Sequence, residues 1–139
     1  MDSYEAYKRL VQPKYLEFFS KDDAEYMYED GVHSPHYIGV AFEFLCDISS
    51  SDLIVDYDDL YNNVFKDKKW LYVDYLAGLT DEFLQSLTPI QIVTIFKAIR
   101  HKELFGTGFI RICGQYGIII RLLRQLESKL EEGECYELH

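Results

Sequence analysis

The sequence predicts an all-α fold: one compact, multi-helix domain that covers residues 1–139. Apolar side chains recur with helical spacing in several segments, and capping residues or glycines mark the ends of these segments. Hydrophobic residues make up 48% of the chain, which is enough for a core that needs no metal or disulfide. One or two short strands are also allowed between residues 52 and 76, where residues 53–55 form an apolar, partly β-branched run.

Two short helices are predicted at the beginning of the chain. Apolar residues with a helical period cover residues 3–20, and Pro13 divides this segment because proline lacks a backbone N–H. Asp22 and Asp23 are good N-cap residues, so they predict a further short helix through Tyr28.

The next predicted helix, over residues 35–48, belongs to the core. Ser34 is a suitable N-cap, and Pro35 fits the first helical position, which needs no backbone N–H. The apolar residues that follow have the i, i+3, i+4, i+7 spacing of a helix with one buried face. This stripe consists of Tyr37, Val40, Ala41, Phe44, Leu45 and Ile48.

Residues 52–77 allow two interpretations, since short apolar runs suit both strands and buried helices. Residues 53–55 form a strand, or Asp56 or Asp58 caps a helix that follows them. Residues 70–76 are predicted to be helical, with a strand as the alternative.

The clearest folding signal starts at Thr88, which is followed by Pro89 and, three residues after the threonine, by Gln91. This spacing predicts a capping box, in which the threonine and glutamine side chains satisfy each other's backbone N–H groups. Thr80 is predicted to cap a shorter helix before it. The helices predicted after Thr88 cover residues 89–105, 109–113 and 117–132, and residues 134–139 are predicted to form a loose tail.

The net charge of −10 is carried entirely by the first part of the chain. Residues 1–60 contain 14 acidic and 4 basic side chains, whereas acids and bases are equal in number over residues 61–139. An acidic surface disfavours nucleic acid and anionic membranes and favours a basic protein partner, although the charge also serves solubility.

The three cysteines, Cys46, Cys113 and Cys135, are odd in number and form no CxxC pair. A reducing, cytoplasmic location is therefore expected. No basic-then-apolar leader opens the chain, and no apolar run is long enough to span a membrane.

Two acidic stretches rich in tyrosine are the candidate protein-binding face. Carboxylates speed the encounter with a basic protein, and tyrosines serve as anchors in the interface. The alternative is a solvated surface with half-buried rings. The candidate residues are Asp22, Asp23, Tyr26, Tyr28, Asp56, Tyr57, Asp58 and Asp59.

A polar cluster beside a glycine-marked break is the candidate ligand site. Arg100 is suited to bind an anion there, and His101 or Glu103 to move a proton. The structural alternative is an ion pair between Arg100 and Glu103 that stabilises the turn at residues 105–108. The sequence supplies no nucleophile, second carboxylate or cofactor loop nearby, so no catalytic residue and no cofactor is assigned, and enzyme activity stays open.

Two further kinds of site have weaker support. His33 and His36 have HxxH spacing, but Ser34 and Pro35 between them are explained by a helix start, so no metal is assigned. The hypothesis that the protein binds nucleic acid rests on the scattered cations Lys97, Arg111, Arg121 and Arg124. The chain lacks the basic excess that nucleic-acid-binding proteins normally have.

The C-terminal part of the chain resembles a small bacterial family of unknown function. That family has an arginine followed by Glu-Arg-Phe-x-x-Gly, then a second glycine and a leucine-rich helix. Leu104 stands where the family has its second arginine, and one extra residue separates the first arginine from the glutamate. The resemblance implies a bacterial or phage cytoplasmic protein and no known activity. The matching residues are Arg100, Glu103, Phe105, Gly108 and Gly117.

Overall fold

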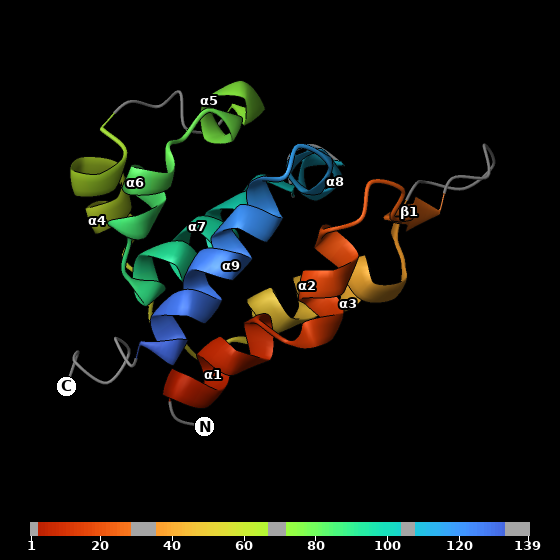
Figure 1. Cartoon of the computed structure of the whole chain (residues 1–139), viewed down its shortest axis with the longest axis horizontal. Coiled ribbons are helices and arrows are strands. Elements are labelled where there is room, and N and C mark those ends of the chain that lie inside the picture. The colour runs from red at the N-terminus through yellow and green to blue at the C-terminus, as the bar shows by residue number, and fades with distance from the viewer. Residues whose placement is uncertain (1–2, 29–35, 67–71, 104–107, 133–139) are drawn as a thin grey trace.

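The computed structural model describes residues 3–28, 36–66, 72–103 and 108–132, and these are mainly helical, as predicted (Figure 1). Two two-residue strands form the only sheet in this part of the chain, and they pair antiparallel. The elements are α1 (Ser3–Leu10), α2 (Pro13–Phe19), β1 (Met27–Tyr28), β2 (His36–Tyr37), α3 (Gly39–Ser50), α4 (Tyr57–Asp59), the π-helical turn η1 (Leu60–Val64), α5 (Val73–Ala77), α6 (Asp81–Gln85), α7 (Pro89–Glu103), α8 (Phe109–Gln115) and α9 (Ile118–Glu131).

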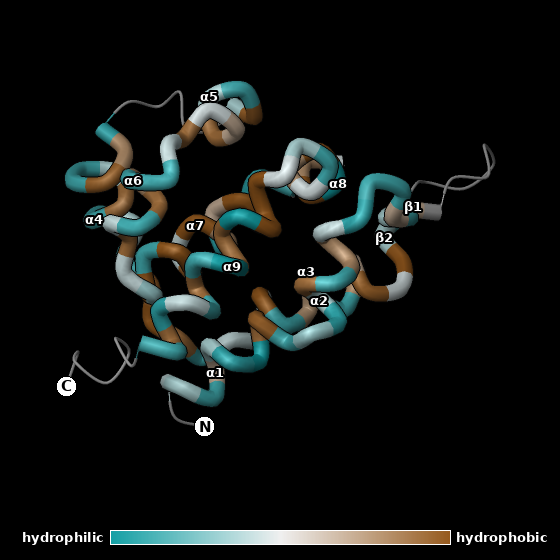
Figure 2. The backbone as a smooth tube through the Cα atoms, viewed as in Figure 1, coloured by the Kyte–Doolittle hydropathy of each residue, from teal (hydrophilic) through white to brown (hydrophobic). Residues whose placement is uncertain are grey.

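Helix α7 is the centre of the core and packs against α3, α8 and α9. Its residues Ile92, Val93, Ile95 and Phe96 are fully buried, and Thr94 and Ala98 are nearly so, which means that most of its circumference is covered by other elements. Figure 2 shows hydrophobic positions along α7 and α9 in the middle of the molecule. Burial of each large apolar side chain contributes about 1.5–3 kcal/mol, so these helices supply much of the driving force for folding.

The capping box predicted at the start of α7 is present. The Thr88 backbone N–H donates to Gln91 Oε1 at 2.9 Å, and the Gln91 backbone N–H donates to Thr88 Oγ1 at 3.3 Å. The predicted cap of α6 is also confirmed, because the Phe83 N–H donates to Thr80 Oγ1 at 3.1 Å. Local side-chain chemistry therefore sets both helix starts.

The helix predicted from Asp22 or Asp23 through Tyr28 is not formed. The segment is extended, and Met27 and Tyr28 pair with Tyr37 and His36 in the small sheet. Pairing with β2 favours the extended chain, in which Tyr26 and Met27 are 3% and 8% exposed.

The core helix predicted over residues 35–48 begins later than expected. Strand β2 occupies His36 and Tyr37, and α3 starts at Gly39, whose φ of +57° is in the left-handed region that favours glycine. Ser34 and Pro35, the predicted start signal, lie outside the described residues. The buried residues Ala41, Phe44, Leu45 and Ile48 confirm most of the predicted stripe, whereas Tyr37 and Val40 are half-buried.

No strand occurs in the described parts of residues 52–76, so the strand alternatives there are wrong. Residues 53–55 are extended but unpaired, and residues 73–76 are helical. Asp56 caps α4 by accepting from the Asp59 N–H at 2.9 Å, as one interpretation predicted. Residues 67–71 and the predicted loose tail over 134–139 lie outside the described residues.

Candidate ligand-binding groove

An open groove runs between α3 and α7, with Arg100 at its middle. It has two lobes of about 280 and 510 Å³, and both are lined by Ser49 and Arg100. The smaller lobe is also lined by Ile48, Tyr57, Lys97 and His101. The larger lobe is also lined by His36, Tyr37, Phe42, Leu45, Cys46 and Glu103.

Helical periodicity places these side chains on facing surfaces. On α3, Phe42, Cys46 and Ser49 have i, i+4, i+7 spacing and are exposed, whereas the intervening apolar residues face the core. On α7, Lys97 precedes Arg100 by three residues, which directs both cations to the same side of the helix. The packing of α3 against α7 therefore assembles a groove from two short sequence patterns.

Arg100 is an unusual residue within this groove. Its Nε atom is buried, and no hydrogen-bond partner reaches it in the described part of the chain. None of the ion pairs among the described residues includes Arg100 either. A polar atom that gives up water normally gains a hydrogen-bond partner, so Arg100 Nε lacks this compensation within the described part of the chain.

Glu103 does not form the expected ion pair with Arg100, because its carboxylate accepts hydrogen bonds from backbone N–H groups instead. Its Oε1 accepts from the Gly108 N–H at 2.6 Å, and its Oε2 accepts from the Ile110 N–H at 2.8 Å. Both donors lie at the start of α8, where backbone N–H groups have no partner within the helix. Glu103 therefore caps α8, and Arg100 does not take part in this contact.

Tyr37 closes the groove at the sheet. Its hydroxyl oxygen accepts from the Arg111 N–H at 3.2 Å, and its hydroxyl also bonds to the Glu103 side chain. Burial is the main cause that raises the pKa of Tyr37, and the charge of Glu103 raises it further. The phenol therefore stays neutral in the groove wall.

Tyr57 forms the opposite end of the groove, and the π-helical turn η1 follows its helix α4 in the chain. The Tyr57 and Tyr61 rings stack with centroids 6.5 Å apart, and burial together with Tyr61 raises the pKa of Tyr57. The Phe65 N–H donates to the Leu60 carbonyl at 2.8 Å, which is the i+5 bond of a π-helix. Such turns are frequent at functional sites.

Lys97 Nζ donates to the Ser51 carbonyl at 3.1 Å and so links α7 to the end of α3.

The predicted acidic face is not continuous. Asp22 and Asp23 are exposed between α2 and β1, whereas Asp58 belongs to α4, and Figure 1 shows these segments toward opposite ends of the molecule. Tyr26, predicted to be an exposed anchor, is buried in the core against Phe18. The Tyr28 side chain lies outside the described residues.

Two carboxylates of the second acidic stretch have structural roles. Asp56 caps α4, while Asp59 accepts from Asn63 at 2.9 Å and from Gln91 at 3.0 Å. The hydrogen bond from Gln91, followed by that from Asn63, lowers the pKa of Asp59. Asp58 and Tyr57 are the predicted binding residues of this stretch that stay exposed without such a bond among the described residues.

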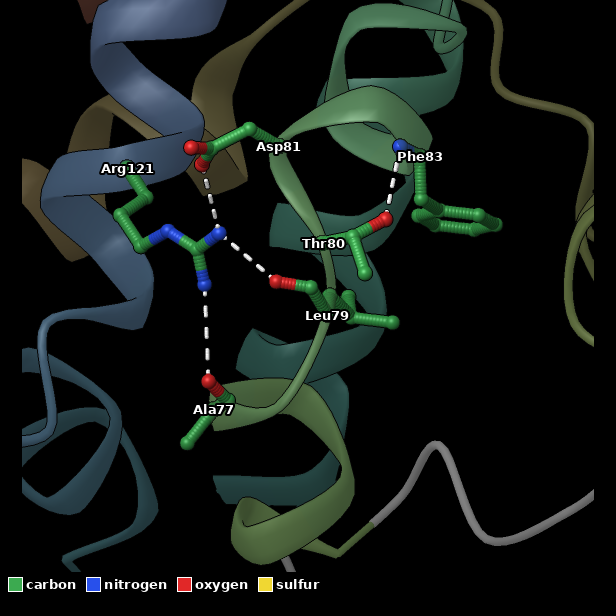
Figure 3. Close-up of polar contacts among 6 residues, drawn as sticks. All are labelled: Ala77, Leu79, Thr80, Asp81, Phe83 and Arg121. Carbon is green, nitrogen blue, oxygen red and sulfur yellow. Dashed lines mark hydrogen bonds and ion pairs between the residues drawn. The ribbon is translucent and has the colours of Figure 1, made fainter.

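Two of the four cations proposed for nucleic acid, Lys97 and Arg121, have separate partners within the protein. Arg121 on α9 donates to the Leu79 carbonyl at 2.7 Å and to Asp81 Oδ1 at 2.9 Å (Figure 3). Lys97 is bonded to the end of α3 instead. These two side chains are therefore directed to different segments and do not form one open basic surface.

The described residues show neither a metal site nor a membrane span. They contain no group of three histidine, cysteine or carboxylate residues placed to hold a metal ion, and His33 lies outside them. No helix described here has both the length and the apolar character needed to cross a membrane.

No protein-family model, curated protein or solved structure matches this chain. The resemblance of the C-terminal region to the bacterial family of unknown function thus stays a prediction.

The sequence singled out Arg100, His101 and Glu103, and the structure places all three along the groove. Sequence reasoning missed the wall formed by α3, including Phe42 and Cys46. The one available signal was an apolar Phe42 outside the buried stripe of its helix.

Proposed function

We propose that the protein binds a small anionic ligand in the groove between α3 and α7, with Arg100 as its main anchor. The observation that supports this most strongly is that Arg100 lines both lobes of the groove, while none of the ion pairs among the described residues includes it. An anionic oxygen in the groove would accept from the Arg100 guanidinium group and give this cation a charged partner.

The local charge favours an anion although the chain as a whole is acidic. Lys97 and Arg100 line the smaller lobe together, whereas the carboxylate oxygens of Glu103 already accept from backbone N–H groups. Arginine binds planar carboxylate and phosphate groups with two parallel hydrogen bonds, so both head groups suit this position.

A thermal-shift comparison tests the proposal. At a fixed ionic strength, phosphate should raise the melting temperature of the wild-type protein above its value in chloride, because a bound ligand stabilises the folded state. At one hundred times Kd the gain is about 2.7 kcal/mol. Arg100→Gln should abolish the shift.

Arg124→Gln is the matched control, because Arg124 is exposed on α9 and its loss changes the net charge equally. It should leave the phosphate effect intact. Equal shifts in wild-type protein and Arg100→Gln would show that the groove does not bind the anion through Arg100.

A second candidate function is binding of a basic protein by the α4 end of the molecule. Tyr57 and Tyr61 are 38% and 44% exposed there, next to the exposed carboxylate of Asp58. Free thiols at Cys46 and Cys113 support the reducing, cytoplasmic location proposed for such a bacterial regulatory module. Asp58→Lys should slow association with a basic partner at low salt, whereas Asp22→Lys, near the other end, should have little effect.

A further inference from the structure

Resting on the proposed function, we infer that the ligand is an organic anion with a compact apolar body, bound with its anionic group at Arg100 and its apolar part in the larger lobe. The two lobes share Arg100 but differ in character. Lys97 is in the smaller lobe, whereas Phe42 and Leu45 line the larger one. A ligand that spans Arg100 therefore meets cations on one side and apolar side chains on the other.

The exposure of Phe42 supports an apolar ligand part. Phe42 is 53% exposed, while Ala41, Phe44 and Leu45 beside it on α3 are at most 7% exposed. A phenylalanine at the mouth of a groove offers a ring face and edge to an apolar or aromatic group. Ligand sites commonly combine such apolar walls with a few polar groups that fix orientation.

The size of the larger lobe also exceeds what an inorganic anion needs. Its volume of about 510 Å³ lies in the range of small-molecule sites, which is roughly 300–1,000 Å³. Water occupies only about 30 Å³ per molecule in the liquid, so a single small ion leaves most of the lobe filled with solvent. A ring or short alkyl chain would displace that solvent from Phe42 and Leu45.

Four probes separate the contributions of charge and apolar body. Phosphate and acetate carry the charge alone, phenyl phosphate carries both features, and 2-phenylethanol carries the ring without charge. Binding can be followed through protection of Cys46, whose exposed thiol lines the larger lobe, against alkylation. Cys135→Ser removes a competing thiol. Alkylation of Cys113 should be slow, because burial raises the pKa of its thiol to about 12.

Phenyl phosphate should protect Cys46 at concentrations at least tenfold lower than phosphate, and phenylethanol should protect weakly. Phe42→Ala should remove most of the difference between the protective concentrations of phenyl phosphate and phosphate, while phosphate still binds. Ile54→Ala is the matched control, because Ile54 is 91% exposed and lies outside the groove. Circular dichroism should show that both variants fold, since each change is on the surface.

The possible outcomes distinguish the two claims. Equal potency of phosphate and phenyl phosphate, each lost in Arg100→Gln, would overturn the apolar-body inference and leave anion binding standing. Failure of all charged probes by both protection and calorimetry would overturn the proposed function as well. If phenylethanol protects as well as phenyl phosphate does, and Arg100→Gln leaves this protection unchanged, the site is apolar and does not recognise charge. This result would contradict both the proposed anion binding and the inferred organic anion.

Discussion

Two buried polar atoms lack a hydrogen-bond partner in the described part of the chain, and their surroundings give them different consequences. The Tyr26 hydroxyl lies within the core, where the ring packs on Phe18 and Phe19. A neutral hydroxyl there costs stability, because it exchanges water for apolar neighbours. Arg100 Nε is buried as well, but the residue lines an open groove, where an anionic ligand can bind its guanidinium group.

Tyr26→Phe should raise the free energy of unfolding by about 1 kcal/mol, since it removes an unsatisfied hydroxyl and keeps the ring. Urea unfolding measures the change. Tyr15→Phe is the matched control, because the Tyr15 hydroxyl donates to Asp47 and its loss should destabilise the protein. Equal losses in the two variants would mean that the Tyr26 hydroxyl has a stabilising partner.

Gly114→Ala should destabilise the protein by about 1–3 kcal/mol, although alanine normally favours a helix. A Cβ atom at position 114 would lie less than 3 Å from the ring and hydroxyl of Tyr26. Gly78→Ala provides the comparison, since a Cβ there meets backbone atoms no nearer than 3.5 Å. A stability of Gly114→Ala equal to that of wild type in thermal unfolding would refute this account of the packing.

At the scale of elements, local signals predicted helix starts well and tertiary contacts decided the exceptions. Thr80 and Thr88 form the predicted caps, because their hydroxyls act within one helical turn. Residues 22–28 had equally good capping residues, but burial of Tyr26 and pairing with β2 favour an extended chain. The role of Glu103 at the start of α8 was also hidden, since it depends on how the turn after α7 folds back.

Arg121 connects α9 to the segment between α5 and α6, as Figure 3 shows. Arg121→Lys should accelerate hydrogen exchange in residues 77–85, because a single ammonium cannot replace the guanidinium at both the Leu79 carbonyl and Asp81. Asp81→Asn should have a smaller effect, since the Asp81 carboxylate is mostly exposed and surface ion pairs contribute about 0–1 kcal/mol. Equal exchange rates in all three proteins would show that Arg121 does not hold this segment.

At the scale of the whole molecule, composition and periodicity predicted the helical class, and the site required the packed structure. Arg100 could be selected from its position beside a glycine break. Its partners in the groove come from α3, roughly fifty residues earlier, and no local pattern predicts which face of α3 lies against α7. The sequence has a real charge asymmetry, but folding places the segment between α2 and β1 and the helix α4 toward opposite ends of the molecule.

Alkaline pH should unfold the protein cooperatively, because burial is the first cause that raises the pKa of Tyr15, Tyr26 and Tyr37, with Tyr26 reaching about 12. Tyrosines of the unfolded chain lose their protons near pH 10, whereas these three keep them in the folded state. The unfolded state then binds fewer protons, so stability is complete below about pH 10 and falls above it.

Urea unfolding at about pH 8 and about pH 11 measures this effect, and Tyr26→Phe should reduce the loss between them. Tyrosinate absorbance followed in parallel should show a fraction of tyrosines that ionise only as the helices unfold. Ionisation of every tyrosine near pH 10 with the helices intact would contradict the assigned burial.

The central claim, that Arg100 anchors an anion, is tested most directly by the side-chain Nε–Hε signal of Arg100 in a proton–nitrogen correlation spectrum. Arg100→Lys removes this signal and so identifies it. The account predicts that phenyl phosphate shifts the Arg100 signal in a saturable way and leaves the signal of exposed Arg124 unchanged. An Arg100 signal that does not move at any concentration of phosphate or phenyl phosphate would contradict the claim.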